Sequence, residues 1–185
     1  AEYAQRYLSL DDAGVFRSVL SRGGRTLRED EVRSCVTAKG PRFMARFEES
    51  FREFPGAARL VERRAARGLV GIVSGALEPE IAFALRKMGV LGNVAFIVSA
   101  ESTMASKPDP LPFLTALEEL KKRGHEGPAV VVEDSLGGIA SAKRARLRCV
   151  AVAHSYSRDE LLGAGADAVV PNLAALGDDV LEEGL

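Results

Sequence analysis

A few polar and charged side chains stand where apolar runs of this sequence end, and their types suit work on phosphate and metal ions. Ser74 and Gly75 follow one apolar run, Glu133 and Asp134 follow another, and Lys107 precedes a proline between them. A serine hydroxyl and free backbone N–H groups at a strand end bind anions. A lysine ammonium binds phosphate as a point charge, and paired carboxylates suit magnesium.

Each of these residues also has an ordinary structural explanation. Ser74 can simply end a strand and cap the next helix, and taken alone that explanation is favoured. Lys107 can be a solvated loop lysine, and its position alone does not decide between the two. Asp134 or Ser135 can cap the following helix, but this explains one acidic residue better than two. Because adjacent carboxylates repel each other without a cation, we favour a metal site at Glu133 and Asp134.

The second part of the sequence alternates short apolar runs with helical patterns. Five runs predict strands, at residues 69–73, 94–98, 129–132, 149–153 and 168–170. Strands that are apolar throughout are typical of a parallel sheet with helices on both faces, which predicts an α/β, Rossmann-like fold. Ligands of such sheets bind beyond the carboxyl ends of the strands, where Ser74 and Glu133 are expected.

Residues 1–54 show helical patterns and no strand pattern. Apolar side chains recur at helical spacing after Asp12, and Thr26 can cap a second helix. We expect that second helix to bend or break at Gly40-Pro41. Helices without a sheet cannot form a large core alone, so we expect residues 1–54 to pack as a small helical subdomain on residues 55–185.

Composition limits the class of protein. The 185 residues are 46% hydrophobic and 28% charged, which fits one domain of ordinary size or a core domain with a small partner. A net charge of −1 gives no electrostatic case for nucleic acid or an anionic membrane. Cys35 and Cys149 match no metal spacing and are expected to be reduced, buried thiols in a cytoplasmic protein. No apolar run reaches membrane-spanning length, and nothing at the start resembles a signal peptide.

The order Ser74, then Lys107-Pro108, then Glu133-Asp134 resembles the second, third and fourth motifs of the haloacid dehalogenase-like superfamily. Neighbouring sequence agrees: FPG at 54–56 precedes the first core helix, and EDSLGGIASAKRA is similar to the family's EDS-x-x-G-I-x-A-x-x-A. Residues 7–16 look like helical-cap sequence of the phosphatase and β-phosphoglucomutase-like branch. The resemblance implies a Rossmann-like core at 55–185 with a small α-helical cap at 1–54.

The resemblance also implies an activity, namely hydrolysis of a small phosphorylated metabolite by a magnesium-dependent phosphatase through an aspartyl-phosphate intermediate. Ser74 and the Gly75 amide would bind the transferring phosphate, and Lys107 would stabilise it beside the nucleophile. Glu133 and Asp134 would help to hold Mg²⁺, with Ser135 as support.

One cap residue enters through the same resemblance. Lys39 falls where mutase-like caps carry a substrate-contacting lysine, although a solvated helix lysine explains it at least as well. Ala76 and Leu77 replace polar residues that are common in mutases, which weakens a mutase assignment.

The family's first motif, Asp-x-Asp-Gly-Thr/Val, is missing from this sequence. In the family it follows the opening strand, and its aspartates attack phosphorus and protonate the leaving group. The run Asp11-Asp12-Ala13-Gly14 has the wrong spacing and no strand pattern before it. The resemblance therefore implies that the sequence begins after the nucleophile, with a gap expected between the strands of Ser74 and Glu133.

Two alternatives to the phosphatase stay open. One is a β-phosphoglucomutase-like sugar-phosphate mutase, and the other is a truncated domain that binds phosphate without turnover. In each case we expect a small phosphorylated ligand, no nucleic-acid or membrane partner, and a monomer or weak dimer.

Overall fold

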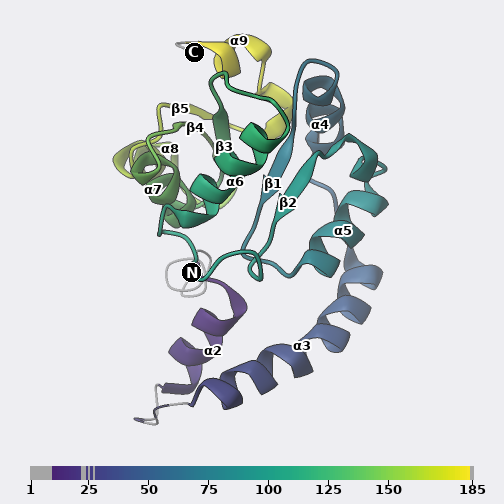
Figure 1. Ribbon diagram of the computed structural model, residues 1–185, viewed down its shortest axis with the longest axis vertical. Coiled ribbons are helices and arrows are strands. Elements are labelled where there is room, and N and C mark those ends of the chain that lie inside the picture. Colours follow the sequence, from purple (N-terminus) through teal and green to yellow (C-terminus); the bar gives the residue numbers. More distant parts are fainter. Residues whose placement is uncertain (1–9, 22–23, 25, 27, 184–185) are drawn as a thin grey trace.

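A computed structural model describes residues 10–21, 24, 26 and 28–183 of the chain (Figure 1). The described part of residues 10–54 contains two helices, α2 (Asp12–Leu20) and α3 (Glu29–Ser50), and no strand. Residues 1–9 of the expected cap lie outside the described residues. The division into a cap and a core at residue 55 stays a prediction.

The helix α3 differs from expectation at two points. It runs unbroken for 22 residues with Pro41 inside it, so the break that was one of the two expected outcomes is not found. Pro41 removes a helix hydrogen bond, but Phe43 and Phe47 stack one turn apart, with ring centroids 5.2 Å apart, beyond it. The helix is capped at Arg28 rather than at Thr26. The Glu31 carboxylate accepts the Arg28 N–H at 3.0 Å, which fixes the start there.

From residue 55 onward, parallel strands alternate with helices, as the sequence predicts. The strands are β1 (Gly71–Val73), β2 (Phe96–Val98), β3 (Val130–Glu133), β4 (Arg148–Val152) and β5 (Ala168–Val170). The α-helices are α4 (Ala57–Ala65), α5 (Glu78–Lys87), α6 (Leu111–Lys122), α7 (Leu136–Arg144), α8 (Arg158–Gly163) and α9 (Asp178–Glu182). Two short 3₁₀ helices, η2 (Leu91–Asn93) and η3 (Leu173–Ala175), complete the described elements.

The strands form two hydrogen-bonded groups, β1-β2 and β3-β4-β5, and every pairing is parallel. Within the described residues, β1 and β3 do not pair with each other. A cavity of about 700 Å³ is lined by both of them, from Val70 to Ser74 and from Ala129 to Asp134. The gap expected between the strands of Ser74 and Glu133 is therefore confirmed.

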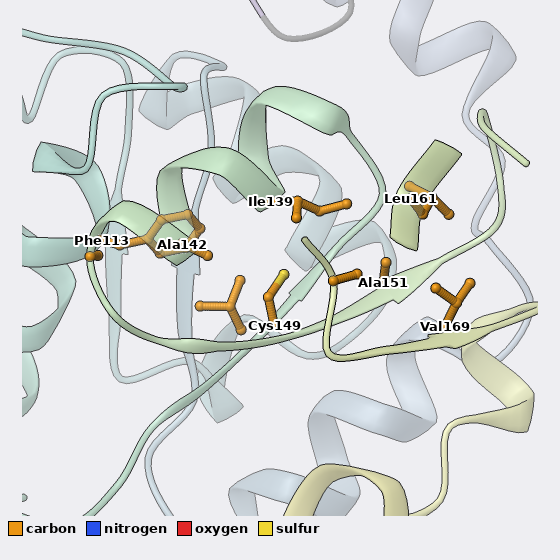
Figure 2. Close-up of a cluster of buried hydrophobic side chains, with 10 residues drawn as sticks. Phe113, Ile139, Ala142, Cys149, Ala151, Leu161 and Val169 are labelled. Atoms are coloured by element: carbon orange, nitrogen blue, oxygen red, sulfur yellow. The ribbon is translucent and has the colours of Figure 1, made fainter. Parts of the chain in front are cut away.

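Apolar side chains cover both faces of the β3-β4-β5 group. On one face, Cys149 and Ala151 of β4 pack with Ile139 of α7 and Leu161 of α8, all fully buried (Figure 2). On the other face, Val150 and Val152 pack with residues of the C-terminal segment such as Leu176 and Leu181. The predicted coverage of both faces is confirmed for this group, and β4 is its central strand.

Both cysteines are free thiols, and Cys149 is buried, as expected. Burial raises the pKa of the Cys149 thiol to about 12, so the group stays protonated at neutral pH. Cys35 on α3 is only half-buried, which departs from the expectation of two buried thiols. No helix in the described parts of the chain has the length and apolar character that crossing a bilayer requires.

Candidate functional site

The residues singled out at the strand ends converge on one cavity. Ser74 follows β1, Lys107 lies in the loop after β2, and Glu133 and Asp134 end β3. All four line the cavity between β1 and β3, and Gly75 lines it too. In Figure 1 this edge of the strands lies on the side of α2, away from α9. Because parallel strands bring their carboxyl ends to one edge, three loops far apart in sequence can act on one ligand here.

The turn after β1 is ordered by hydrogen bonds. The Ser74 N–H donates to the Val98 carbonyl at 2.9 Å, which extends the β1-β2 pairing into the turn. The Ser74 hydroxyl oxygen accepts the Ala76 N–H at 3.1 Å. The Leu77 N–H donates to the Glu80 carboxylate at 3.2 Å. Ser74 therefore orders the turn, but it does not cap the next helix as its structural explanation proposed, because the N-cap of α5 is Leu77. The Ser74 O–H proton stays available to a ligand.

Gly75 is the residue of this turn whose amide is free. The Glu78 N–H donates to Glu101 at 3.1 Å, and the amides of Ala76 and Leu77 are engaged as described. Within the described residues, the Gly75 N–H has no acceptor. The predicted role of the Gly75 amide in holding phosphate is compatible with this arrangement.

Lys107 spans the gap between the two strand groups. Its ammonium donates to the carbonyl of Val73, the last residue of β1, at 3.1 Å, and it also bonds the Glu133 carboxylate at the end of β3. The ammonium lies 4.9 Å from the ring centroid of Phe113. Its side chain is only 14% exposed, so Lys107 is not a solvated loop lysine.

The carboxylates of Glu133, the last residue of β3, and Asp134, which follows it, differ in their hydrogen-bond partners. Besides Lys107, Glu133 accepts the N–H of Asp134 at 3.2 Å and the N–H and hydroxyl of Ser135 at 3.4 and 3.1 Å. The Asp134 carboxylate has no hydrogen-bond or ion-pair partner in the described parts of the chain. Burial, followed by the charge of Glu133, raises the pKa of Asp134 above its usual value.

The N-cap of α7 shows which of two neighbouring residues, Asp134 or Ser135, has a structural role. Ser135, not Asp134, is the N-cap, and its hydroxyl oxygen accepts the Gly138 N–H at 3.0 Å. The alternative in which Asp134 caps the helix is therefore wrong. A Cβ at Gly138 would overlap the Glu133 carboxylate, so a side chain there would force that carboxylate to move from its present position.

The carboxylates fit a magnesium ion in part. Among the described residues, no group of three or more His, Cys, Asp and Glu side chains forms a ready cluster. Magnesium usually takes one or two protein carboxylates and completes its shell with water and substrate phosphate. Asp134 offers a free carboxylate for direct binding, whereas the oxygens of Glu133 are already bonded and suit an orienting or water-mediated role.

Lys39 is the one predicted site residue that does not line the cavity. Its ammonium binds both oxygens of Asp12 at 2.8 and 2.7 Å, and one oxygen of Glu80 at 3.4 Å. A solvated helix lysine is thereby excluded. A contact between Lys39 and a substrate stays a prediction.

Sequence reasoning missed Asp11 at this site. Asp11 lines the cavity, caps α2 by accepting the Gly14 N–H at 2.7 Å, and accepts the Ser106 hydroxyl proton at 2.6 Å. It thereby ties the start of α2 to the residue before Lys107. The only sequence signal was an acidic residue at a helix start, which helix capping alone explains.

Comparison with known proteins identifies similar chains. The sequence profile described as haloacid dehalogenase-like hydrolase matches residues 9–152. Phosphoglycolate phosphatase from Rhodospirillum rubrum is 29% identical over 185 residues, covering 91% of this chain and 76% of that protein.

Two solved structures are similar across most of the chain. CbbY from Rhodobacter sphaeroides, solved in complex with phosphate, is 26% identical with a TM-score of 0.77, covering 95% of this chain and 79% of its own. β-Phosphoglucomutase from Clostridium difficile is 21% identical with a TM-score of 0.78, covering 95% and 77%, and supports the fold alone.

Proposed function

The chain belongs to the haloacid dehalogenase-like hydrolase family, and on that premise we propose that it is a magnesium-dependent phosphatase of a small phosphorylated metabolite. One observation carries the proposal: a free amide, a hydroxyl, an ammonium and a free carboxylate, from three loops, line a single cavity at the strand ends. These groups match the needs of phosphoryl transfer, in which positioning and charge stabilisation supply most of the catalysis.

The residues of the chain have distinct roles in this proposal. The Ser74 hydroxyl and the Gly75 N–H donate hydrogen bonds to oxygens of the transferring phosphate. Lys107, already seated between the two strand ends, balances the negative charge that the phosphate brings. Because Lys107 also pairs with Glu133, its ammonium is held in place before a ligand arrives, which limits the reorganisation needed during reaction.

Asp134 would hold the magnesium ion directly, with Glu133 orienting it or binding it through water. A bound magnesium ion would offset part of the charge on the phosphate oxygens. The support is the chemistry of the donor set: Asp134 is an unpaired carboxylate whose pKa burial raises, and a cation would relieve the cost of ionising it there.

The nucleophile would be an aspartate on a strand that lies between β1 and β3. Its carboxylate oxygen attacks phosphorus, the bond from phosphorus to the ester oxygen breaks, and a second acid protonates the departing alcohol. Water then hydrolyses the acyl phosphate, which releases inorganic phosphate and restores the carboxylate. The 700 Å³ cavity and the unpaired state of β1 towards β3 support this placement.

Residues 1–54 would act as a helical cap on a core of residues 55–185. The Asp11–Ser106 hydrogen bond places the start of α2 at the strand ends, and α3 rests on α5, where the Phe47 and Phe83 ring centroids are 5.3 Å apart. A cap in this position can exclude water and select among phosphate esters.

The relatives support a small phosphorylated metabolite as the substrate. They include a phosphoglycolate phosphatase and a CbbY solved with xylulose 1,5-bisphosphate. The apolar side chains of Ala76 and Leu77, directly after the phosphate-binding turn, disfavour the mutase alternative. We also infer a cytoplasmic location, which the two free thiols support.

The decisive experiment is a phosphate-release assay on the full-length protein with sugar phosphates, phosphoglycolate and nucleotides, with and without Mg²⁺. We expect release from at least one ester only with Mg²⁺. Binding of inorganic phosphate without release from any ester would favour the non-catalytic alternative. Absence of both binding and release would overturn the proposal.

A further inference from the structure

Three charged side chains from α2, α3 and α5 meet beside the phosphate-binding turn. The Lys39 ammonium of α3 binds Asp12 of α2 at 2.7 Å and Glu80 of α5 at 3.4 Å. It also lies 4.2 Å from the ring centroid of Phe43. The side chains of Lys39, Asp12 and Glu80 are 26%, 24% and 5% exposed. One ammonium therefore joins two helices of the proposed cap to a nearly buried carboxylate of the core.

The Glu80 carboxylate is divided between two partners. One oxygen binds Lys39, and the other accepts the N–H of Leu77. Leu77 is the N-cap of α5 and follows Ser74, Gly75 and Ala76 directly. In the described part of the chain, Lys39 is the only cation that binds this carboxylate. A buried carboxylate is costly without such a partner, so the rotamer of Glu80 depends on Lys39.

We propose that Glu80 is a positioning residue that couples the docking of α2 and α3 to the order of the phosphate-binding turn. This inference rests on the proposed function, because it assigns the turn from Ser74 to Leu77 to phosphate. With α3 docked, Lys39 fixes Glu80, Glu80 fixes the Leu77 N–H, and Gly75 keeps its place in the turn that lines the cavity. Since coupling is reciprocal, bound phosphate favours the docked helices to the same extent.

Aromatic packing beside the three charged side chains allows the coupling to be tested without separating α3 from α5. Phe47 of α3 and Phe51, which follows the helix directly, lie on Phe83 of α5, with ring centroids 5.3 and 6.4 Å apart. We expect these rings to hold α3 on α5 when the charge of Lys39 is removed. Lys87 of α5 supplies a matched control, because it also contacts a ring of this cluster, Phe83 at 5.4 Å, and pairs weakly with Glu48 at 3.9 Å. Within the described residues, Lys87 forms no hydrogen bond or ion pair with the turn from Ser74 to Leu77.

The experiment measures inhibition by inorganic phosphate and hydrogen exchange of the Leu77 amide in Lys39→Met, Glu80→Gln and the double variant. Each single change is expected to weaken phosphate binding about tenfold, because each removes one partner of a mostly buried ion pair. The double variant should lose no more than either single variant, since both break the same link. Lys39→Arg should restore most of the binding, and Lys87→Met should match the parent.

The competing explanations predict other patterns. A Lys39 that only contacts substrate would raise KM in Lys39→Met, while Glu80→Gln and inhibition by inorganic phosphate stayed unchanged. A purely structural ion pair would lower Tm in both variants without altering phosphate inhibition or Leu77 exchange. Either result would overturn the coupling.

The outcome also separates this inference from the proposed function. If the parent protein releases no phosphate from any ester, calorimetric titration with inorganic phosphate replaces the inhibition assay. Faster Leu77 exchange and weaker phosphate binding in Lys39→Met would then support the coupling in a non-catalytic protein. If Lys39→Met left hydrogen exchange of the Leu77 amide unchanged in an active enzyme, the coupling would be wrong and the proposed function would stand.

Discussion

At the residue scale, Asp134 is the sharpest test of the metal assignment. In the full-length protein, Asp134→Asn should abolish magnesium-dependent turnover, because among the described residues it removes the one unpaired carboxylate at the end of β3. The fold should survive. Since the pKa of Asp134 is raised, ionising it costs stability without a cation at neutral pH, and a neutral amide avoids that cost. Phosphate release and circular dichroism measure the two effects, and full activity in the variant would exclude Asp134 as a ligand.

Lys107 should prove necessary for both turnover and stability. In the full-length protein, Lys107→Ala is expected to cost several orders of magnitude in turnover, on the scale of about 10³ seen when a key electrostatic group is lost. It should also lower Tm, because Glu133 is left buried without its cation. Lys122→Ala is the matched control, since Lys122 is an exposed lysine that pairs with Glu119 on its own helix. A variant that kept its kcat would remove Lys107 from the mechanism.

The site residues that the sequence could predict are those that lie near strand ends. Ser74 and Lys107 could be placed because each stands next to a recognisable element and the edge of a parallel sheet gathers such positions. The partners of Lys39 could not be found in this way. Asp12 and Glu80 lie 27 and 41 residues from it in sequence, and only the docking of three helices brings their charges together.

At the element scale, α4 and α9 are joined by a charged cluster, two of whose members, Arg64 and Arg67, also line the cavity between β1 and β3. Asp178 of α9 binds Arg63, Arg64 and Arg67 of the α4 segment at 3.2, 3.0 and 2.9 Å. The hydrogen bond from Arg64 is the main cause that lowers the pKa of Asp178 below its ordinary value of 3.8. A lowered carboxylate pKa stabilises the fold above that value, and the stabilisation is lost as pH falls through the folded-state pKa.

Asp178→Asn should therefore lower Tm at pH 7, and the difference from the parent should shrink as pH falls below about 4. Thermal unfolding followed by circular dichroism between pH 3 and 7 measures this. Asp179→Asn, one residue along the same helix, is the control and should leave Tm nearly unchanged. A difference that stayed constant with pH would show that Asp178 acts through packing rather than charge.

The sequence predicted elements better than their ends. Apolar runs and helical patterns located the strands and helices after residue 55, because burial on both sheet faces leaves continuous apolar strands that are easy to recognise. Of the bend or break expected at Gly40-Pro41, the break is absent for a tertiary reason. The rings of Phe43, Phe47 and Phe51 pack against one another, and Phe47 also packs against Phe83. This packing offsets the tendency of proline to interrupt a helix.

At the scale of the whole molecule, the gap between β1 and β3 is the feature that the family resemblance predicted and local patterns could not. Nothing in the strands themselves shows that they are not neighbours. The interior of the gap is also unlike an ordinary surface cleft, since Lys107 reaches across it to a main-chain carbonyl of β1. A backbone N–H of an adjacent strand would satisfy that carbonyl in a continuous sheet.

The last prediction is that a strand supplied to this gap completes both the sheet and the active site. Placing an apolar strand that ends in Asp-x-Asp before residue 1 of the 185-residue chain should raise Tm, by about 2–4 °C for each kcal/mol gained in a chain of this size. The strand would pair with β1 and β3, bury the cavity walls, and supply backbone N–H groups to carbonyls such as that of Val73, while Lys107 stays paired with Glu133. Magnesium-dependent phosphate release should appear with it.

Two controls separate the structural from the chemical effect of the strand. The same extension with its first aspartate changed to asparagine should raise Tm equally and restore no turnover, because only the nucleophile is lost. A scrambled extension of the same composition should do neither, since its apolar residues no longer match the two faces of the sheet. Equal turnover with and without the strand would place the nucleophile elsewhere in the chain. An unchanged Tm with the ordered strand would show that the space between β1 and β3 is not a strand position.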